Sequence, residues 1–581
     1  MTPADVAMAR AEDGVRGHFR RILDVIAAGC GGQNHNNPRY ASPARRSSRR
    51  RHFVRQDMSE SRATQSFDKR AFIPRRVNAQ IVRRYDIGES EIGAGGYGRV
   101  FVAEDREILG RHVAIKKVST ARRSKREAFR REVAVMRSLD HPNICKLLET
   151  YESEEERSMF LVMEYCDAGD LFECINRDGR HGIPEAECVD IIRQVAGAIK
   201  YAHAHGVAHR DLKPENICLI KAGDGTPHVK VIDWGLSAFF NIEGQSRQMH
   251  SNVGSPSYVA PEVLQGSRSS GYTERCDLWS FGVLTFVSLT ARFPFCAPSA
   301  DALLHTIRST TWDKLARSLK ECSRECHDFI SGLLRMDPAE RLTAQQLLEH
   351  RWLRRRGTTD MRSVLSNVCR CSSRTFSASF FAALVARQLD HQALRELPKV
   401  FLALDTDGNG ELDLDEVRRG FEEMFGVDSR ELNDIERIFS LLDLDGSGTL
   451  DYTEFCAAGL GDRIADEVAP MRAAFKTFDV HDDNGRITRH EFETVLLKAG
   501  ARAAGEIETE QVFRAFDANG DGELDYQEWE AFVAHHVADG GRQAGGFSRC
   551  STGTPTAASS ASEISTTEIS GGDADCIEVF I

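Results

Sequence analysis

The chain divides into regions with different patterns of apolar and polar residues. Between Tyr85 and Trp352, short runs of β-branched and apolar residues come first and longer helical patterns follow. This order predicts strands and then helices in a globular α+β region. From about Leu394 a repeat of roughly 38 residues begins, in which apolar residues at helical spacing flank four acidic loops that contain glycine. This second region is predicted to be all-α.

The segment 354–390 between these regions has an apolar face at helical spacing. Six arginines precede this face, which consists of Phe376, Phe380, Phe381, Leu384, Val385 and Leu389. A basic amphipathic helix beside an acidic helical region is typical of a calmodulin target next to its sensor.

Residues 1–80 form a basic extension, and near its start apolar residues recur at helical spacing and form one stripe. The stripe favours a helix that packs on its own protein, with docking on a membrane surface as the alternative. Position 2 is Thr2, so the glycine that N-myristoylation requires is missing. The rest of the extension to Arg70, and the Gly/Ser/Thr-rich tail 538–581, are predicted to be disordered.

Composition narrows the class of protein. The length of 581 residues predicts about three to five domains. The sequence contains no apolar run of about 18 residues, so we expect no membrane-spanning helix. The first residues lack a basic-then-apolar signal sequence, and the 15 cysteines form no Cys-x-x-Cys pairs. We therefore expect reduced thiols in a cytoplasmic protein, with peripheral membrane contact as an open alternative.

Charge is segregated along the chain. Residues 1–70 hold 14 basic and 7 acidic side chains, whereas residues 391–540 hold 35 acidic and 14 basic ones. This asymmetry indicates separate tasks for the two segments. The arginine run near residue 50 alone supports nucleic-acid binding, and no nucleic-acid partner is expected.

A series of motifs typical of phosphoryl transfer occurs in the first globular region. Glycines allow a hairpin to close over phosphates with its N–H groups free, and a lysine at the end of a buried strand needs a charged partner. The motifs are Gly93–Val100 (GAGGYGRV), Val113–Lys116 (VAIK), Glu132 in a helical stretch, His209–Asn216 (HRDLKPEN), Asp233–Gly235 (DWG), Ala260–Glu262 (APE), Asp277–Gly282 (DLWSFG) and Arg341.

Together these residues resemble the protein kinase family over about 85–353. The resemblance implies an α+β bilobal kinase fold that transfers the γ-phosphate of ATP. It implies that Lys116 holds the α- and β-phosphates and pairs with Glu132. Asp211 would accept or orient the proton of the substrate hydroxyl, and Lys213 would contact the γ-phosphate, as in the serine/threonine type.

The resemblance also implies a set of nucleotide and metal contacts. Mg²⁺ would be held by Asn216 and Asp233. Asp170 and Glu215 resemble acidic positions that bind an arginine three residues before the phospho-acceptor, although Asp170 binding the ATP ribose is an open alternative. Besides Lys116, the implied ATP-binding residues are Gly93, Ala94, Gly95, Gly96, Tyr97, Gly98, Val100, Ala114, Glu164, Cys166 and Asp170.

One residue departs from the kinase pattern. Trp234 stands where phenylalanine is usual, at a position that packs against the helix carrying Glu132. Whether the larger indole shifts the equilibrium between the active and inactive states of the kinase is left open by the sequence. Because no catalytic residue is missing, an active kinase is the favoured reading over a pseudokinase.

Three of the four acidic loops match the calcium loop of an EF-hand. Such a loop places oxygen ligands at positions 1, 3, 5, 7, 9 and 12, glycine at 6 and a bidentate glutamate at 12. The predicted calcium ligands are Asp405, Asp407, Asn409, Glu411, Asp413 and Glu416 in the first loop; Asp443, Asp445, Ser447, Thr449, Asp451 and Glu454 in the second; and Asp517, Asn519, Asp521, Glu523, Asp525 and Glu528 in the fourth.

The third loop is irregular. Aligning Gly485 with position 6 and Glu491 with position 12 puts Val480 at position 1 and leaves Asp479 one residue too early, so the loop is predicted to carry an insertion. Asp482, Asn484 and Glu491 remain as predicted ligands. Weak binding, a purely structural hand and full occupancy all stay open for this loop.

The whole order of regions closely resembles the calcium-dependent protein kinases of plants and protists over about 80–535. The resemblance implies a kinase domain (85–353), an autoinhibitory junction (354–390) and a calmodulin-like sensor of four EF-hands (391–537). It implies a serine/threonine kinase that uses ATP, Mg²⁺ and Ca²⁺, acts on protein substrates with arginine three residues before Ser/Thr, and is released when the sensor captures the junction helix. A catalytically silent calcium sensor or scaffold is the alternative.

Overall fold

The computed structural model describes the chain between residues 68 and 538. Within that span it leaves out 79, 96–97, 178–181, 222–226, 243–244, 252, 267–270, 355–359, 372–373, 375, 391–393, 395, 462, 464–467, 481–482 and 500–508. Nearly all of the predicted N-terminal extension and the predicted C-terminal tail therefore lie outside the described residues. Gly96, Tyr97 and Asp482 do so as well.

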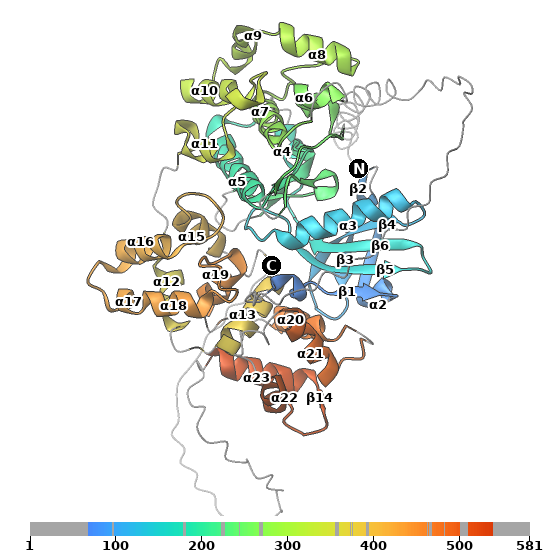
Figure 1. Cartoon of the computed structure of the whole chain (residues 1–581), viewed down its shortest axis with the longest axis vertical. Helices are drawn as coiled ribbons and strands as arrows, with labels where there is room; N and C mark the ends of the chain where they lie inside the picture. The colour runs from blue at the N-terminus through green and yellow to red at the C-terminus, as the bar shows by residue number, and fades with distance from the viewer. Residues whose placement is uncertain are drawn as a thin grey trace, which may run out of the picture. The chain divides into compact units, whose positions relative to one another are not determined.

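The first lobe is a six-stranded sheet with one long helix against it (Figure 1). The strand order is β1-β5-β6-β4-β3-β2, antiparallel throughout except for the parallel pair β1–β5. Helix α3 buries Phe129, Glu132 and Val135 along one face, as the 3.6-residue period requires. The elements are β1 (Arg75–Val77), α2 (Ile81–Arg84), β2 (Tyr85–Gly95), β3 (Gly98–Asp105), β4 (His112–Ser119), α3 (Arg123–Ser138), β5 (Leu147–Ser153) and β6 (Ser158–Glu164).

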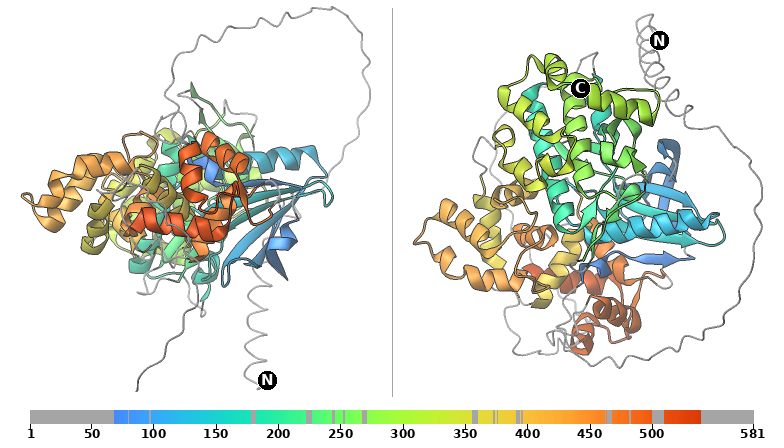
Figure 2. Two further views of the ribbon diagram at one scale, coloured as in Figure 1. Left: turned by 90° about the horizontal axis from the view of Figure 1, so that it is seen from below. Right: turned by 45° about the horizontal axis from the view of Figure 1, so that its top comes forward.

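The second lobe is mainly helical, and its green helices gather in the right-hand view of Figure 2. Helix α7 is apolar all round and buried over its whole length, as expected of the central helix of a lobe. The helices are α4 (Leu171–Ile175), α5 (Glu185–Ala204), α6 (Pro261–Leu264), α7 (Arg275–Thr290), α8 (Ala300–Ser309), α9 (Trp312–Ala316), α10 (Arg324–Leu333) and α11 (Ala344–Glu349). Short strand pairs are β7 (Val207–Ala208) with β10 (Ala238–Phe239), β8 (Ile217–Ile220) with β9 (His228–Val231), and β11 (Asn241–Ile242) with β12 (Gln245–Ser246).

The region after residue 390 is built from helix–loop–helix hands. Its loops pair through Leu412 with Leu450 and through Ile487 with Leu524. The elements are α15 (Leu397–Leu404), α16 (Leu414–Phe425), α17 (Arg430–Asn433), α18 (Ile435–Leu442), α19 (Tyr452–Gly459), α20 (Val468–Phe478), β13 (Ile487–Thr488), α21 (Arg489–Lys498), α22 (Thr509–Phe516), β14 (Glu523–Leu524) and α23 (Tyr526–Ala538). The predicted bilobal α+β fold followed by EF-hands is confirmed.

Two helices fill the junction, α12 (Arg362–Arg370) and α13 (Phe376–Gln388). The sequence predicted a helix with a single apolar face, but every residue from Ala378 to Leu389 is buried. Helix α13 contacts α18, α19, α20 and α23, so hands from both halves of the sensor cover it. Arg387 and Gln388, at the end of α13, are buried as well, and Arg387 pairs there with Asp140 of the kinase domain. Among the described residues, none of the helices has the length and apolar character that crossing a membrane requires.

Candidate active site and calcium loops

A buried lysine stands at the centre of the kinase site. Lys116 on β4 donates from Nζ to Glu132 Oε1 on α3 at 2.6 Å and to Asp233 Oδ1 at 2.7 Å. Burial disfavours the ammonium, but the two carboxylates outweigh burial and raise the pKa of Lys116. The lysine is therefore charged, which is the state that binds phosphate oxygens.

Asp233 is held in a left-handed backbone conformation, φ 58° and ψ 72°. This uncommon conformation for a non-glycine residue turns its carboxylate toward Lys116 and away from Trp234. The indole of Trp234 is fully buried and lies edge-on to His209, with ring centroids 4.7 Å apart. The core thus accommodates the indole while the ion pair of Lys116 and Glu132 is formed.

The second catalytic cluster centres on Asp211. Its Oδ2 accepts from Lys213 Nζ at 2.8 Å and from Asn216 Nδ2 at 3.2 Å. Its Oδ1 accepts from the backbone N–H and the hydroxyl of Ser255, both at 2.9 Å. Ser255 was not predicted, because a lone serine between a glycine and a proline gives no signal of a role in the sequence.

The glycine-rich hairpin lies over β4. Val100 pairs with Lys116 across β3 and β4, and a Cβ at Gly98 would lie 2.7 Å from the Lys117 carbonyl oxygen. Glycine at 98 therefore permits the close approach of the hairpin. Gly93, Ala94 and Gly95 are in the strand β2, and Ala114 is buried in β4.

The side chains of two predicted ATP-binding residues, Glu164 and Cys166, make contacts within the kinase domain. The Glu164 carboxylate pairs with Lys230 Nζ at 2.9 Å and accepts from the backbone N–H of Lys146 at 2.6 Å. The free thiol of Cys166 hydrogen-bonds with the thiol of Cys218, and this bond together with burial raises the pKa of Cys166. Contact with an adenine is therefore left to the backbone of these two residues.

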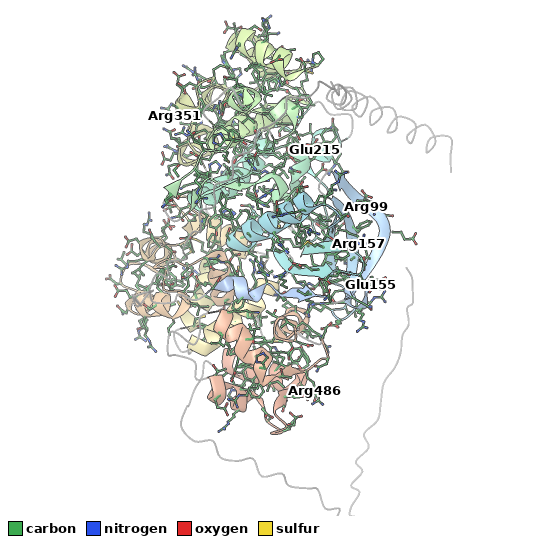
Figure 3. The ribbon with its side chains drawn as sticks, turned by 45° about the vertical axis from the view of Figure 1, so that its right-hand side comes forward. Arg99, Glu155, Arg157, Glu215, Arg351 and Arg486 are labelled. Atoms are coloured by element: carbon green, nitrogen blue, oxygen red, sulfur yellow. The ribbon has the colours of Figure 1, made fainter. Side chains whose placement is uncertain are left out.

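The two acidic residues predicted to bind an arginine lie near each other. Asp170 caps α4 and accepts from the Glu173 N–H at 2.8 Å. Glu215, labelled in Figure 3, has one buried carboxylate oxygen without a hydrogen-bond partner among the described residues. Burial, with the charge of Asp170 nearby, raises the pKa of Glu215, and burial raises that of Asp170.

The first, second and fourth calcium loops share one pattern of hydrogen bonds. In each, the position-1 aspartate accepts from the position-6 glycine N–H: Gly410 to Asp405 at 2.9 Å, Gly448 to Asp443 at 2.9 Å, and Gly522 to Asp517 at 3.1 Å. The position-12 glutamate oxygens of the first two loops converge with those of Asp405 and Asp407, and of Asp443 and Asp445, within 4.8 Å. These oxygen sets fit calcium.

Other predicted ligands lie in the same loops. Asp413, Asp451 and Asp525 cap the helices that follow and accept from the position-12 glutamate N–H. Asn409, Ser447, Asn519 and Asp521 hydrogen-bond within their own loops. Glu411 and Thr449 meet through their side chains at 2.8 Å, and Glu523 pairs with Arg486 at 3.1 Å.

The third loop has the predicted insertion, and Asp479 takes the place of its first aspartate. Asp479 Oδ2 accepts from the Gly485 N–H at 2.9 Å, as the first aspartate does in the other loops. The Val480 N–H bonds to Glu491 Oε1 at 3.2 Å, as Thr406 does to Glu416 at 2.8 Å. Asp479 is thus position 1 and Val480 position 2, because the extra residue lies between Val480 and Asn484.

Comparisons with known proteins agree with this architecture. Residues 87–353 match the protein kinase domain, residues 395–458 an EF-hand domain pair and residues 509–533 an EF hand. The chain is 32% identical over 455 residues to calcium-dependent protein kinase 3 of Plasmodium berghei (strain Anka), covering 77% of this chain and 79% of the relative.

Two further relatives cover similar shares. Calcium-dependent protein kinase 5 of Plasmodium falciparum (isolate 3D7) is 30% identical over 460 residues, 78% of each chain. Calcium-dependent protein kinase 19 of Arabidopsis thaliana is 31% identical over 457 residues, 77% of this chain and 80% of the relative. The kinase domain uses ATP and Mg²⁺, and the EF-hand domains bind Ca²⁺. The chain belongs to the calcium-dependent protein kinases, and it is a calcium-regulated serine/threonine protein kinase.

Proposed function

We propose that the junction 354–390 holds the kinase inactive without calcium, and that the sensor takes up the junction when calcium binds. The observation that carries this proposal is the burial of α13, which the sensor helices α18, α19, α20 and α23 cover over most of its length. Phe381 packs against Phe516, Trp529 and Phe532, with ring centroids 5.2, 5.6 and 6.0 Å apart. A helix that is apolar over most of its surface needs such a cover, and an opened EF-hand pair provides one.

The connection between the two junction helices adds polar contacts to the same arrangement. The buried guanidinium of Arg374 donates to the carbonyls of Ala457 at 3.0 Å and Gly461 at 3.1 Å, near the end of α19. Cations stabilise the C-terminal end of a helix. Arg374, one of the basic residues before α13, therefore supports the capture of the junction by the sensor.

Calcium must shift a conformational equilibrium to activate the enzyme. A change from 1:99 to 99:1 requires about 5.5 kcal/mol of differential binding. Divided among three regular loops, that is roughly 2 kcal/mol per calcium ion, an ordinary coupling energy between sites.

The geometry of the kinase site supports direct phosphoryl transfer to a hydroxyl. Bound Mg-ATP supplies the phosphoryl group and a metal that spreads its developing charge. Asp211 accepts the proton of the substrate hydroxyl, while Lys213, 2.8 Å from that carboxylate, stabilises negative charge nearby. Lys116, fixed by Glu132, orients the phosphates.

For the substrate we propose a basic residue three positions before the phospho-acceptor. Asp170 and Glu215 form an acidic pair whose pKa values are raised because burial disfavours their charged forms. An arginine brought by a substrate would favour both charges and satisfy the free oxygen of Glu215. This pairing provides a reason for a buried carboxylate to lack an internal partner.

The test is phosphate transfer by the full chain to a peptide with arginine three residues before serine, in EGTA and in saturating calcium. A matched peptide with alanine in place of arginine is the control for the acidic pair. We expect a rate that depends strongly on calcium and is at least about tenfold higher with arginine. Equal rates in EGTA and calcium would contradict the junction mechanism, and equal rates with the two peptides would contradict the substrate assignment.

A further inference from the structure

The third calcium loop contains a cation supplied by the chain. Lys476, on the last turn of α20, donates from Nζ to Asp479 Oδ2 at 3.0 Å and to Asp483 Oδ1 at 3.0 Å. The same ammonium lies 3.4 Å from Glu107 Oε2 of the kinase domain. The Lys476 side chain is 12% exposed and that of Asp479 is fully buried. A buried pair of this kind is not readily separated, because an isolated buried charge is costly.

No lysine occupies this position of the helix in the regular hands, and the lysine nearest the first loop, Lys200 of the kinase domain, lies 3.6 Å from the half-exposed Asp407 of position 3. The residue three positions before the first aspartate is Leu402 in the first hand and Ser440 in the second. In the fourth hand it is Arg514, which pairs with Glu510 on its own helix at 2.8 Å. Only in the third hand, among the described hands, does this position carry a cation that contacts the aspartate of position 1.

The fourth loop provides a contrast. There Arg486, labelled in Figure 3, lies 3.3 Å from Asp521 Oδ2, but both side chains are about half exposed. An exposed ion pair is worth little, so calcium displaces it at small cost. The buried pair of Lys476 and Asp479 opposes the binding of calcium in the third loop. This loop also carries the insertion after Val480.

The same loop contacts the kinase sheet through a buried arginine. Arg76 on β1 is 1% exposed and donates from Nε to Glu149 Oε2 on β5 at 2.9 Å. Its other nitrogens donate to the carbonyls of Asp479 and Lys476, each at 2.9 Å. These carbonyls lie at the C-terminal end of α20, where a positive charge is favourable. One guanidinium therefore joins β1 and β5 to the third hand.

We propose that the third hand takes no calcium and is instead a docking element for the first lobe of the kinase, with Lys476 in place of the ion and Arg76 as the anchor. Two independent observations carry this inference: the buried ammonium between Asp479 and Asp483, and the buried guanidinium on the loop carbonyls. The EF-hand matches at 395–458 and 509–533 do not include this loop. The docking rests on the proposed function, because it occurs in the state in which the sensor encloses the junction.

The calcium part is tested by the number of ions bound, measured by isothermal titration calorimetry on the full chain. We expect three calcium ions per chain, still three in Asp479→Asn, and two in the matched variant Asp517→Asn of the fourth hand. Asparagine keeps an oxygen for the Gly485 N–H, so the loop retains its turn. Four ions in the parent protein, falling to three in Asp479→Asn, would overturn this part.

The docking part is tested by hydrogen exchange of the α20 amides in saturating calcium. Arg76→Gln removes the charge that joins the loop to the sheet, and we expect these amides to exchange at least about tenfold faster. The matched control is Arg75→Gln, since Arg75 is the exposed neighbour on β1 and pairs only with Glu152 among the contacts described here. Equal α20 exchange in the two variants would overturn the docking. Neither measurement depends on phosphate transfer, so failure here is distinct from failure of the proposed function.

Discussion

Arg387 of the junction and Asp140 of the kinase domain form an ion pair, with Nη1 2.7 Å from Oδ1. The other oxygen of the same carboxylate accepts from the backbone N–H of Thr453 in the sensor at 3.0 Å. Arg387 is 7% and Asp140 14% exposed. One carboxylate thus joins the kinase domain, the junction and the second hand, so its loss should weaken the state in which the sensor encloses the junction.

Replacement of Asp140 by asparagine is the first prediction. The amide keeps one acceptor but removes the charge that Arg387 faces, which costs about 1–3 kcal/mol. We expect Asp140→Asn to raise the calcium concentration for half-maximal activity several-fold and to leave the rate at saturating calcium nearly unchanged. A kinase assay over a calcium titration measures both. If Asp140→Asn and Arg387→Met each shift the midpoint but the double variant shifts it no further, the two residues act as a pair; a midpoint unmoved in all three would contradict this role.

The second prediction concerns the proposed base. Asp211→Asn retains the shape of the cluster around Ser255 and Lys213 but cannot accept a proton. Loss of such a group typically lowers the rate by about 10²–10⁴-fold. We expect turnover to fall by that factor while the number of calcium ions bound stays the same. Unchanged turnover in Asp211→Asn would show that Asp211 is not the base of the reaction.

Arg210 leads to a third prediction, on the segment between Gly235 and Ala260, called here the activation segment. Its guanidinium donates to the Leu236 carbonyl at 2.6 Å and to the Tyr272 hydroxyl at 3.1 Å, and that hydroxyl donates to the Ser251 carbonyl at 2.6 Å. These bonds order the segment without a phosphate. We therefore expect phosphatase-treated protein to keep its calcium-stimulated rate.

A matched pair of variants checks the same point. Tyr272→Phe should lower the rate by about fivefold, because one buried hydrogen-bond network worth about 1 kcal/mol is lost. Ser246→Ala, in an exposed strand, should leave the rate unchanged. Inactivity of the dephosphorylated parent protein would show that a phosphate, and not Tyr272, completes the segment.

The fourth prediction separates the regular calcium loops from the third. Glu454→Gln and Glu528→Gln each remove a charged bidentate ligand, and we expect each to raise the calcium needed for activation by about tenfold or more. Glu491→Gln in the third loop should leave the calcium midpoint nearly unchanged. The three variants are compared in one calcium titration of kinase activity. If Glu491→Gln shifts the calcium midpoint as far as Glu454→Gln does, the third hand binds calcium and the assignment is wrong.

Much of this architecture follows from local sequence, and what does not follow depends on distant contacts. Motifs such as His209–Asn216 and the regular calcium loops have fixed spacing, so periodicity and ligand chemistry locate them. Lys116 needed a partner and Glu132 is that partner. The insertion in the third loop could be predicted from the spacing, but its place is set by backbone hydrogen bonds, which the sequence does not display. Arg76 and Asp140 gave no signal, since their partners lie hundreds of residues away.

Helix α13 and Trp234 illustrate the same limit. The amphipathic pattern of 376–389 predicted one buried face, but the sensor covers most of the helix and the kinase domain covers its end, where Arg387 pairs with Asp140. Trp234 raised the question of a disturbed active state from its size alone. Its effect depends on the space around it, and the structure places the indole in the core beside His209 with Lys116 still paired.

The fifth prediction is a dependence of stability on pH that comes from His141. This imidazole is fully buried, and burial together with the charge of Lys230 lowers its pKa from 6.5 to about 3. Its Nδ1 accepts from the Asn143 N–H at 3.0 Å, which requires the neutral ring. Above pH 6.5 the folded and unfolded chains both hold a neutral His141, so it contributes no pH dependence there. Between pH 6.5 and 3 the unfolded chain binds a proton that the folded chain does not.

The free energy of unfolding should therefore fall by about 1.4 kcal/mol for each pH unit below 6.5 through this residue alone. His141→Gln keeps an acceptor for Asn143 but does not titrate, so its loss of stability between pH 6.5 and 5 should be smaller by about 2 kcal/mol. Urea unfolding followed by tryptophan fluorescence suits this comparison, because four of the five tryptophans lie in the kinase domain. Carboxylates that titrate in the same range are common to both proteins and cancel in the difference. Parallel pH profiles would mean that the folded kinase binds a proton at His141 as readily as the unfolded chain does.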